Sequence, residues 1–228
     1  MKAKARFSAT FLFMTVLFTV CLITSNLLAT KIFAIGTKIS LPCAVLVFPL
    51  SYILNDCFTE VYGYRKARLV IWVAFAMNLL VVAFGLLSVA LPAASFWQGG
   101  DHFNFVFGMA PRVVVASLLA FLAGSTLNSL VLSKMKLASG GRNFGWRAIV
   151  SSFAGEFCDS LIFMPIAFWG TPVKTLAVMM LVQVSFKVLY EMVILPVTGA
   201  VVRKLKAVEG EDAFDDGISY NPFRINDI

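Results

Sequence analysis

The sequence predicts an all-α integral membrane protein with six transmembrane helices. Of its 228 residues, 60% are hydrophobic and only 14% are charged, and the mean hydropathy is +0.87. These values lie far outside the composition of soluble globular domains. In addition, six runs that carry few or no charges each approach or exceed the about 20 residues that a helix needs to cross the hydrocarbon core of a bilayer.

The predicted spans follow one another with short connections. They are Phe7–Ala29, Leu41–Val61, Leu69–Leu91, Val113–Ser133, Ala148–Trp169 and Thr175–Val202. The first run is longer than the apolar region of a signal peptide, which is about 7 to 15 residues, so we expect it to be retained as a helix. Prolines within or near the spans are expected to kink some helices, namely Pro42, Pro49, Pro165 and Pro196.

The basic residues predict the orientation of the chain. Of the 19 lysines and arginines, 14 fall at the termini and in the connections on one side of the predicted bundle. Four fall on the other side, namely Lys31, Lys38, Arg112 and Lys174. Because cytoplasmic loops carry the excess of positive charge, both termini are predicted to be cytoplasmic. The net charge of +7 thus reflects topology and contact with anionic lipid, and we expect no nucleic-acid partner.

Two regions are predicted from the change in composition near the end of the chain. Residues 1–206 form the membrane domain, and residues 207–228 form an acidic cytoplasmic tail. Segments that are acidic and poor in apolar residues usually remain mobile. Ile218, Tyr220 and Phe223 are the tail residues best suited to dock on the membrane domain.

Charged residues inside the predicted spans mark the candidate site. Five are carboxylates and one is a lysine, and they are Asp56, Glu60, Glu156, Asp159, Lys187 and Glu191. Five carboxylates facing lipid would cost about 15 kcal/mol on insertion scales, so they should face a polar interior. With a single lysine among them, most of these acids must take up a proton or bind a ligand.

The spacing of these residues places them on shared helix faces. Glu156 and Asp159 are three residues apart, and Lys187 and Glu191 are four apart, at similar predicted depths near the middle of the bilayer. Asp56 and Glu60 are four apart and lie nearer the cytoplasmic end of their span. Glu60 has a second interpretation, an interfacial pair with Arg65 or Arg68 just beyond the helix that only stabilises the loop.

Other polar residues in the spans are candidates for ligand contact or for interhelical hydrogen bonds. They are Asn26, Asn128 and Gln183. Amides present both a donor and an acceptor to a flat heterocycle, but between membrane helices they also bond to one another. Tyr52 and Tyr190 are among the aromatic residues placed to stack on a planar ligand.

Several functional classes are disfavoured. The four cysteines show no C-x-x-C spacing, the chain has one histidine, and no nucleotide-binding glycine motif or serine elbow is present. We therefore expect no metal, no cofactor and no enzymatic activity.

Four sequence blocks carry a family resemblance. They are SNLLATKIF from Ser25, FPLSYILNDCFTEVYGYRKAR from Phe48, GEFCDSLIF from Gly155 and KVLYEMVILP from Lys187. Together they resemble the queuosine precursor transporter family. The resemblance implies a bacterial inner-membrane carrier of six helices, similar to the substrate-binding subunits of energy-coupling-factor transporters. The implied cargo is 7-cyano-7-deazaguanine and 7-aminomethyl-7-deazaguanine, which serve queuosine modification of tRNA.

With such a cargo, the charged residues acquire expected roles. A guanine-like ring offers N1–H and an exocyclic amino group, which one carboxylate accepts side by side. We expect Asp159 or Glu156 to be that carboxylate, Lys187 to donate to the ring carbonyl, and Glu191 to orient the lysine. Asp56 and Glu60 would serve the cytoplasmic gate or contact the 7-substituent.

Two alternatives stay open at this point. The chain can be a vitamin- or nucleobase-binding subunit of a multi-component importer, or a non-transporting scaffold whose charges pair only with one another. A homodimer and a coupling proton are compatible with the sequence, which does not determine them.

Overall fold

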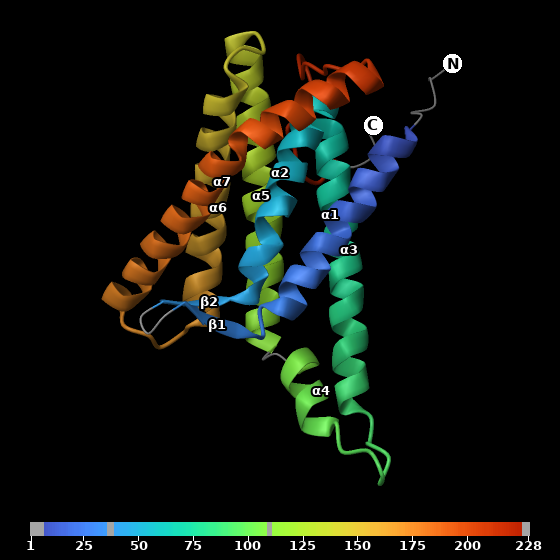
Figure 1. Ribbon diagram of the computed structural model, residues 1–228, viewed down its shortest axis with the longest axis vertical. Helices are drawn as coiled ribbons and strands as arrows, with labels where there is room; N and C mark the ends of the chain where they lie inside the picture. The colour runs from blue at the N-terminus through green and yellow to red at the C-terminus, as the bar shows by residue number, and fades with distance from the viewer. Residues whose placement is uncertain (1–6, 36–38, 109–110, 225–228) are drawn as a thin grey trace.

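A computed structural model describes residues 7–35, 39–108 and 111–224, which form a bundle of long helices (Figure 1). The helices are α1 (Ala9–Leu28), α2 (Phe48–Cys57), α3 (Gly63–Ala90), α4 (Gly100–Phe107), α5 (Pro111–Ser139), α6 (Phe144–Ala167) and α7 (Val173–Glu209). A 3-10 helix, η1 (Cys43–Leu46), precedes α2, and a π-helix, η2 (Phe58–Tyr62), follows it. The prediction of a helical membrane fold is confirmed.

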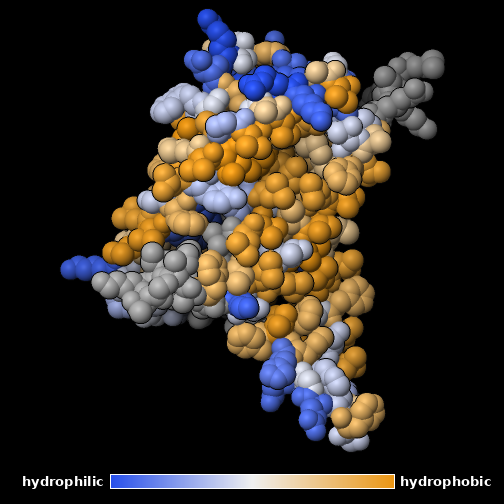
Figure 2. All heavy atoms as spheres, in the orientation of Figure 1, coloured by the Kyte–Doolittle hydropathy of each residue, from blue (hydrophilic) through white to orange (hydrophobic). Residues whose placement is uncertain are grey.

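Five helical stretches are long and apolar enough to cross a membrane. They are Ala9–Leu28, Pro49–Ala90, Val113–Ser139, Phe144–Ala167 and Val173–Glu209. On the face that the space-filling view shows, apolar side chains cover most of the middle of the molecule, and hydrophilic side chains gather toward its two ends (Figure 2). The chain is therefore a multi-pass membrane protein. Lys2, Lys4, Arg6 and Lys38, which the orientation argument used, lie outside the described residues.

The stretch Pro49–Ala90 reverses direction at Gly63, so that α2 and α3 run antiparallel (Figure 1). Gly63 has φ +84°, in the region that favours glycine, and a Cβ there would lie 2.8 Å from Asp215 Oδ1. The contacts agree with the reversal. The backbone N–H of Tyr64 and the hydroxyl of Ser133 both donate to Asp215, so the start of α3 lies near the end of α5. Gly85, near the end of α3, lies against Phe107, which comes shortly before α5 begins. Helix α3 therefore runs antiparallel to α5.

The second span begins later than predicted. Leu41 was expected to start it, but residues 39–42 form a strand, β2 (Ile39–Pro42), which pairs antiparallel with β1 (Ile32–Ile35). Helix α2 starts at Phe48, with Pro49 in its first turn, where a proline has no hydrogen bond to lose. Pro49 thus begins the helix instead of kinking it. The hairpin was missed because a short apolar run reads equally well as strand or helix.

The other helices match the predicted spans but are longer or differently bounded. Helix α5 continues six residues beyond the predicted Ser133, and α7 continues seven beyond Val202. Both extensions carry lysines, which hydropathy excludes from a span although they are good helix formers. Gly140 and Gly210 follow these helices with positive φ, as is common at helix C-termini.

Helices α5 and α6 pack closely because small residues face each other. A Cβ at Gly155 would lie 2.8 Å from the backbone oxygen of Gly124 and 2.8 Å from Asn128 Cβ, and a Cβ at Gly124 would lie 2.9 Å from Gly155 O. Without a hydrophobic force between helices in lipid, such close backbone approach is a main source of packing energy. The pair also fixes where Asn128 and Asp159 stand relative to each other.

Replacing Gly155 by alanine should therefore destabilise the bundle by about 1 to 3 kcal/mol, the usual cost of overpacking. Backbone atoms of α5 cannot move aside as a flexible side chain does. Thermal unfolding in detergent measures the loss. Gly199→Ala in α7 is the matched control, since its Cβ would meet only Arg203 Nη1 at 3.9 Å. Equal stability of the two variants would contradict the close packing.

The C-terminal tail lies against α3. The ring of Tyr220 packs on Tyr64 with 5.1 Å between centroids, and Phe223 packs on Trp72 at 5.8 Å. Arg68 donates two hydrogen bonds to backbone carbonyls of the tail. Tyr220 and Phe223 thus dock on the membrane domain, as their apolar character suggested.

Candidate functional site

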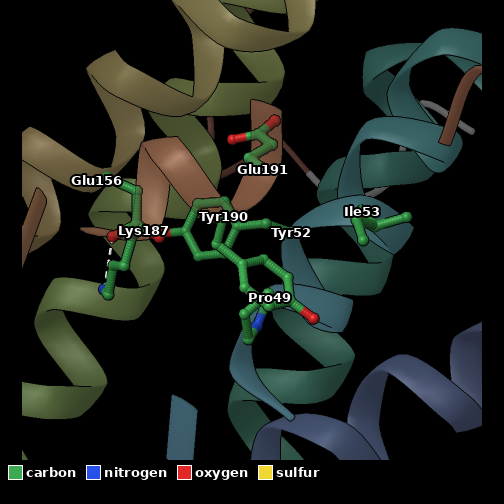
Figure 3. A pocket seen from close by; sticks show the side chains of 7 residues that line it. All are labelled: Pro49, Tyr52, Ile53, Glu156, Lys187, Tyr190 and Glu191. Carbon is green, nitrogen blue, oxygen red and sulfur yellow. Dashed lines mark hydrogen bonds and ion pairs between the residues drawn. The ribbon is translucent and has the colours of Figure 1, made fainter. Parts of the chain in front are cut away.

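Three helices meet around one small cavity in the interior of the bundle (Figure 3). Its lining comes from α2, α6 and α7, and consists of Pro49, Tyr52, Ile53, Glu156, Lys187, Tyr190 and Glu191. The cavity volume is about 10 Å³, which is room for about one water molecule. In this structure the cavity is therefore too small for a ligand larger than water.

Lys187 and two carboxylates of α6 form the charged centre of this site. Lys187 Nζ lies 2.5 Å from Glu156 Oε2 and 3.5 Å from Asp159 Oδ2. The side chain of Glu156 is 4% exposed and that of Lys187 is 15% exposed. One ammonium thus faces two carboxylates in a largely dry environment, which leaves an excess of acceptors for a ligand with N–H groups.

A second polar group lies beside the first, between α2, α5 and α7. Asp56 Oδ1 accepts a hydrogen bond of 2.9 Å from Asn128 Nδ2, and both side chains are fully buried. Glu191 Oε1 accepts one of 2.6 Å from Ser152 Oγ of α6. The carboxyls of Asp56 and Glu191 are close enough to interact through a hydrogen bond.

Glu60 belongs to a separate cluster one helical turn beyond Asp56. Arg147 donates two hydrogen bonds of 2.6 and 3.0 Å to the carboxylate of Glu60, and Lys206 donates one of 2.9 Å. Lys136 donates to the backbone oxygen of Glu60, and both lysines also reach Asp212 of the tail. Glu60, Arg147 and Lys136 are each at most 2% exposed. The cluster ties α5, α6, α7 and the tail to the end of η2.

The tail completes this cluster through Asp212. Burial raises the pKa of Asp212, but the hydrogen bonds from Lys136 and Lys206 lower it by more, so the pKa lies below its ordinary value. A carboxylate with a lowered pKa stabilises the fold above its ordinary pKa and loses that contribution only as the pH falls further. The docking of the tail at Asp212 is therefore independent of pH around neutrality.

The structure brings six of the nine predicted site residues together. They are Asp56, Asn128, Glu156, Asp159, Lys187 and Glu191. The expectation that Glu191 orients Lys187 differs from the geometry, in which Glu156 and Asp159 stand beside the ammonium. Glu191 lies one turn further along α7, where it accepts the hydrogen bond from Ser152 and interacts with Asp56.

The remaining three predicted residues lie elsewhere. Glu60 is held by Arg147 and Lys206, and not at the cavity. Asn26 of α1 accepts a hydrogen bond of 3.4 Å from Ser117 of α5. Gln183 is half-buried on α7, one turn before Lys187, and is absent from the cavity lining.

Sequence reasoning missed Ser152, Arg147 and Lys136. Ser152 lies four residues before Glu156, so the helix face shared by these two contained the signal. Arg147 and Lys136 were assigned to cytoplasmic connections because they lie at the ends of the predicted spans. No sequence pattern shows that their side chains turn inward to Glu60.

Comparisons with known proteins identify the family of the chain. Residues 42–201 match the family described as "Putative vitamin uptake transporter". The chain is 32% identical over 122 residues to the "Probable queuosine precursor transporter" of Bacillus subtilis, covering 52% of each chain. It is 28% identical over 166 residues to the "Queuosine precursor transporter" of Escherichia coli, covering 69% of this chain and 71% of that one.

A third relative, the "Probable queuosine precursor transporter" of Haemophilus influenzae, is 28% identical over 128 residues, or 54% of this chain and 50% of that one. The chain thus spans about half the length of two of these relatives. No solved structure matches it. Because the family match covers more than half of the sequence, including α2, α5, α6 and most of α7, the chain belongs to the vitamin uptake transporter family.

Proposed function

We propose that the chain imports the queuosine precursors 7-cyano-7-deazaguanine and 7-aminomethyl-7-deazaguanine across the bacterial inner membrane. The observation that carries this proposal is the pairing of Lys187 with Glu156 and Asp159. Lys187 and Glu156 line an interior cavity together with two tyrosines. The names of the three relatives supply the cargo.

The chemistry of the group fits a deazaguanine. Glu156 or Asp159 accepts the N1–H and the exocyclic amino group of the ring, and Lys187 donates to its carbonyl oxygen. Tyr52 and Tyr190, which line the same cavity, stack on the ring faces. The excess of carboxylates also favours the positively charged aminomethyl form.

The topology of the proposal has six crossings with both termini in the cytoplasm. The sixth crossing is the short segment formed by α2 and η2, which the reversal at Gly63 separates from α3. The lower end of α2 in the view follows the β1–β2 hairpin, which lies across the direction of the helices (Figure 1). The positive charge at the end that holds both termini supports the orientation.

Entry of a substrate requires the site to open. A cavity of about 10 Å³ does not admit a bicyclic ring, so Tyr52 and Tyr190 must separate. These residues belong to α2 and α7, and the gap between the two helices is the expected route. Binding then closes α7 back on α2, which is how a carrier alternates between states.

A thermal-shift experiment tests the cargo. The purified protein is heated with each deazaguanine, with guanine and with a vitamin such as riboflavin. A ligand at 100 times its Kd should stabilise the fold by about 2.7 kcal/mol. We expect this for the deazaguanines and a smaller effect for guanine. Stabilisation by the vitamin alone would replace the proposed cargo by a vitamin.

Uptake into proteoliposomes tests whether the chain works alone. Entry of radiolabelled 7-cyano-7-deazaguanine into vesicles that contain only this protein is the expected result. Binding without entry would identify a substrate-binding subunit that needs partner proteins. Neither binding nor entry would favour a structural scaffold.

A further inference from the structure

The group formed by Asp56, Asn128 and Glu191 is rich in acceptors and poor in donors. Asp56 Oδ2 and Asn128 Oδ1 are buried, and neither has a hydrogen-bond partner among the residues that the structure describes. Glu191 is 8% exposed and presents its carboxyl both to the cavity and to Asp56. Buried polar atoms without partners are rare in folded proteins, and here two of them belong to side chains that are hydrogen-bonded to each other.

Nearby cations are engaged with other carboxylates. Lys187 pairs with Glu156 and Asp159, and Arg147 uses its two terminal nitrogens on Glu60. Arg147 acts on Asp56 only through longer-range electrostatics. The charge of the Asp56–Glu191 pair is therefore not balanced by a direct ion pair in the described part of the chain.

Two adjacent carboxyls in a dry site cannot both be ionised without a large repulsion, and such pairs share one proton. A proton between them also supplies the missing donor. We propose that Asp56 and Glu191 together bind one proton, and that this proton fastens α7 to α2 beside the substrate cavity. The proton site uses other residues than Lys187, Glu156 and Asp159, which we assign to substrate binding.

The position of the pair explains how a proton would control access. Asp56 is on α2 and Glu191 is on α7, the two helices that must separate to admit a substrate. With the proton present, the two carboxyls attract each other and the gap stays closed. Loss of the proton leaves one negative charge on each helix, and their repulsion opens the gap. The link between protonation and opening to the substrate rests on the proposed transport function, whereas the proton site itself does not.

Other titratable groups surround the pair and belong to the same electrostatic system. On α2 and η2 they are Tyr52, Cys57 and Glu60, on α6 Arg147, Glu156 and Asp159, and on α7 Lys187. A metal cation is a weaker candidate than a proton. It needs six or more oxygen ligands, and no cluster of three metal-binding side chains occurs among the residues searched.

Thermal unfolding as a function of pH tests the proton site without any substrate. If the folded chain holds one proton more than the unfolded chain, its stability falls as the pH rises. Above the ordinary carboxyl pKa of about 4, and up to the pKa of the folded pair, the ratio of folded to unfolded protein should fall by up to tenfold for each pH unit. The measurement is made in detergent with fixed salt.

The variants Asp56→Asn and Glu191→Gln each remove the shared proton while keeping a donor at the same place. Each should flatten the pH dependence, and the double variant should add nothing. Asp101→Asn is the control, because Asp101 is exposed on α4 and should keep the slope of the unmodified protein. A flat profile for the unmodified protein, or an unchanged slope in Asp56→Asn, would overturn the proposal. Stabilisation by Na⁺ at constant pH, lost in Asp56→Asn, would assign the site to sodium instead.

Transport gives a second and separate readout. An inward proton gradient should accelerate uptake of 7-cyano-7-deazaguanine several-fold in the unmodified protein, and the acceleration should be lost in Asp56→Asn. If the deazaguanine neither binds nor enters but the pH-dependent unfolding behaves as expected, the cargo is wrong and the proton site stands. If uptake occurs but ignores the gradient in both proteins, the coupling is wrong.

Discussion

Replacing Glu60 by glutamine should destabilise the protein by about 3 to 5 kcal/mol, the cost of leaving a buried ion-pair partner uncompensated. Glu60 is 1% exposed and is the acceptor for Arg147, itself 1% exposed, and for Lys206. Glutamine keeps the shape of the side chain but removes the negative charge and one acceptor. The guanidinium of Arg147 is then buried without a matching carboxylate. Thermal unfolding and the monodisperse fraction in detergent measure the loss.

An exposed ion pair of the same chain provides the control for Glu60. Lys66 and Glu211 lie 2.7 Å apart, but their side chains are 21% and 41% exposed. Solvent-exposed pairs contribute about 1 kcal/mol or less, so Glu211→Gln should be nearly neutral. If Glu60→Gln is as mild as Glu211→Gln, the Glu60 cluster does not hold the helix ends together.

The positions of the spans could be predicted because the bilayer makes length and hydropathy sufficient criteria. The beginning of α2 could not. A continuous apolar run from Leu41 concealed a strand and a 3-10 helix, and the reason lies in the pairing of residues 39–42 with β1, which is tertiary information. The turn at Gly63 was hidden for the same reason, because Asp215, more than 150 residues later, fills the space beside it.

The charged centre could be predicted in part. Helical spacing put Glu156 and Asp159 on one face and Lys187 at a similar depth, and these residues do pair. The partnership of Asp56 with Glu191 depends on which helices are neighbours. Sequence periodicity contains no such information.

Replacing Lys187 by methionine should weaken binding of 7-cyano-7-deazaguanine by about 10- to 100-fold. A hydrogen bond from a charged donor contributes about 1.5 to 3 kcal/mol, which corresponds to this change in Kd. The variant also removes the partner of Glu156 and lowers stability, so a loss of binding alone is ambiguous. The double variant Lys187→Met with Glu156→Gln removes the uncompensated charge. It should recover stability relative to the single variant without recovering binding.

Lys174→Met is the matched control, since Lys174 is exposed in the first turn of the same helix. Calorimetric titration of all three variants with the deazaguanine gives the Kd values. Binding that returns in the double variant would show that Lys187 contributes only by neutralising Glu156. Binding that survives in Lys187→Met would place the substrate away from this lysine. If the substrate binds at this ion pair, binding should be weak in both Lys187→Met and the double variant. The reason is that the lysine must exchange part of its contact with Glu156 and Asp159 for the ring carbonyl when the site opens.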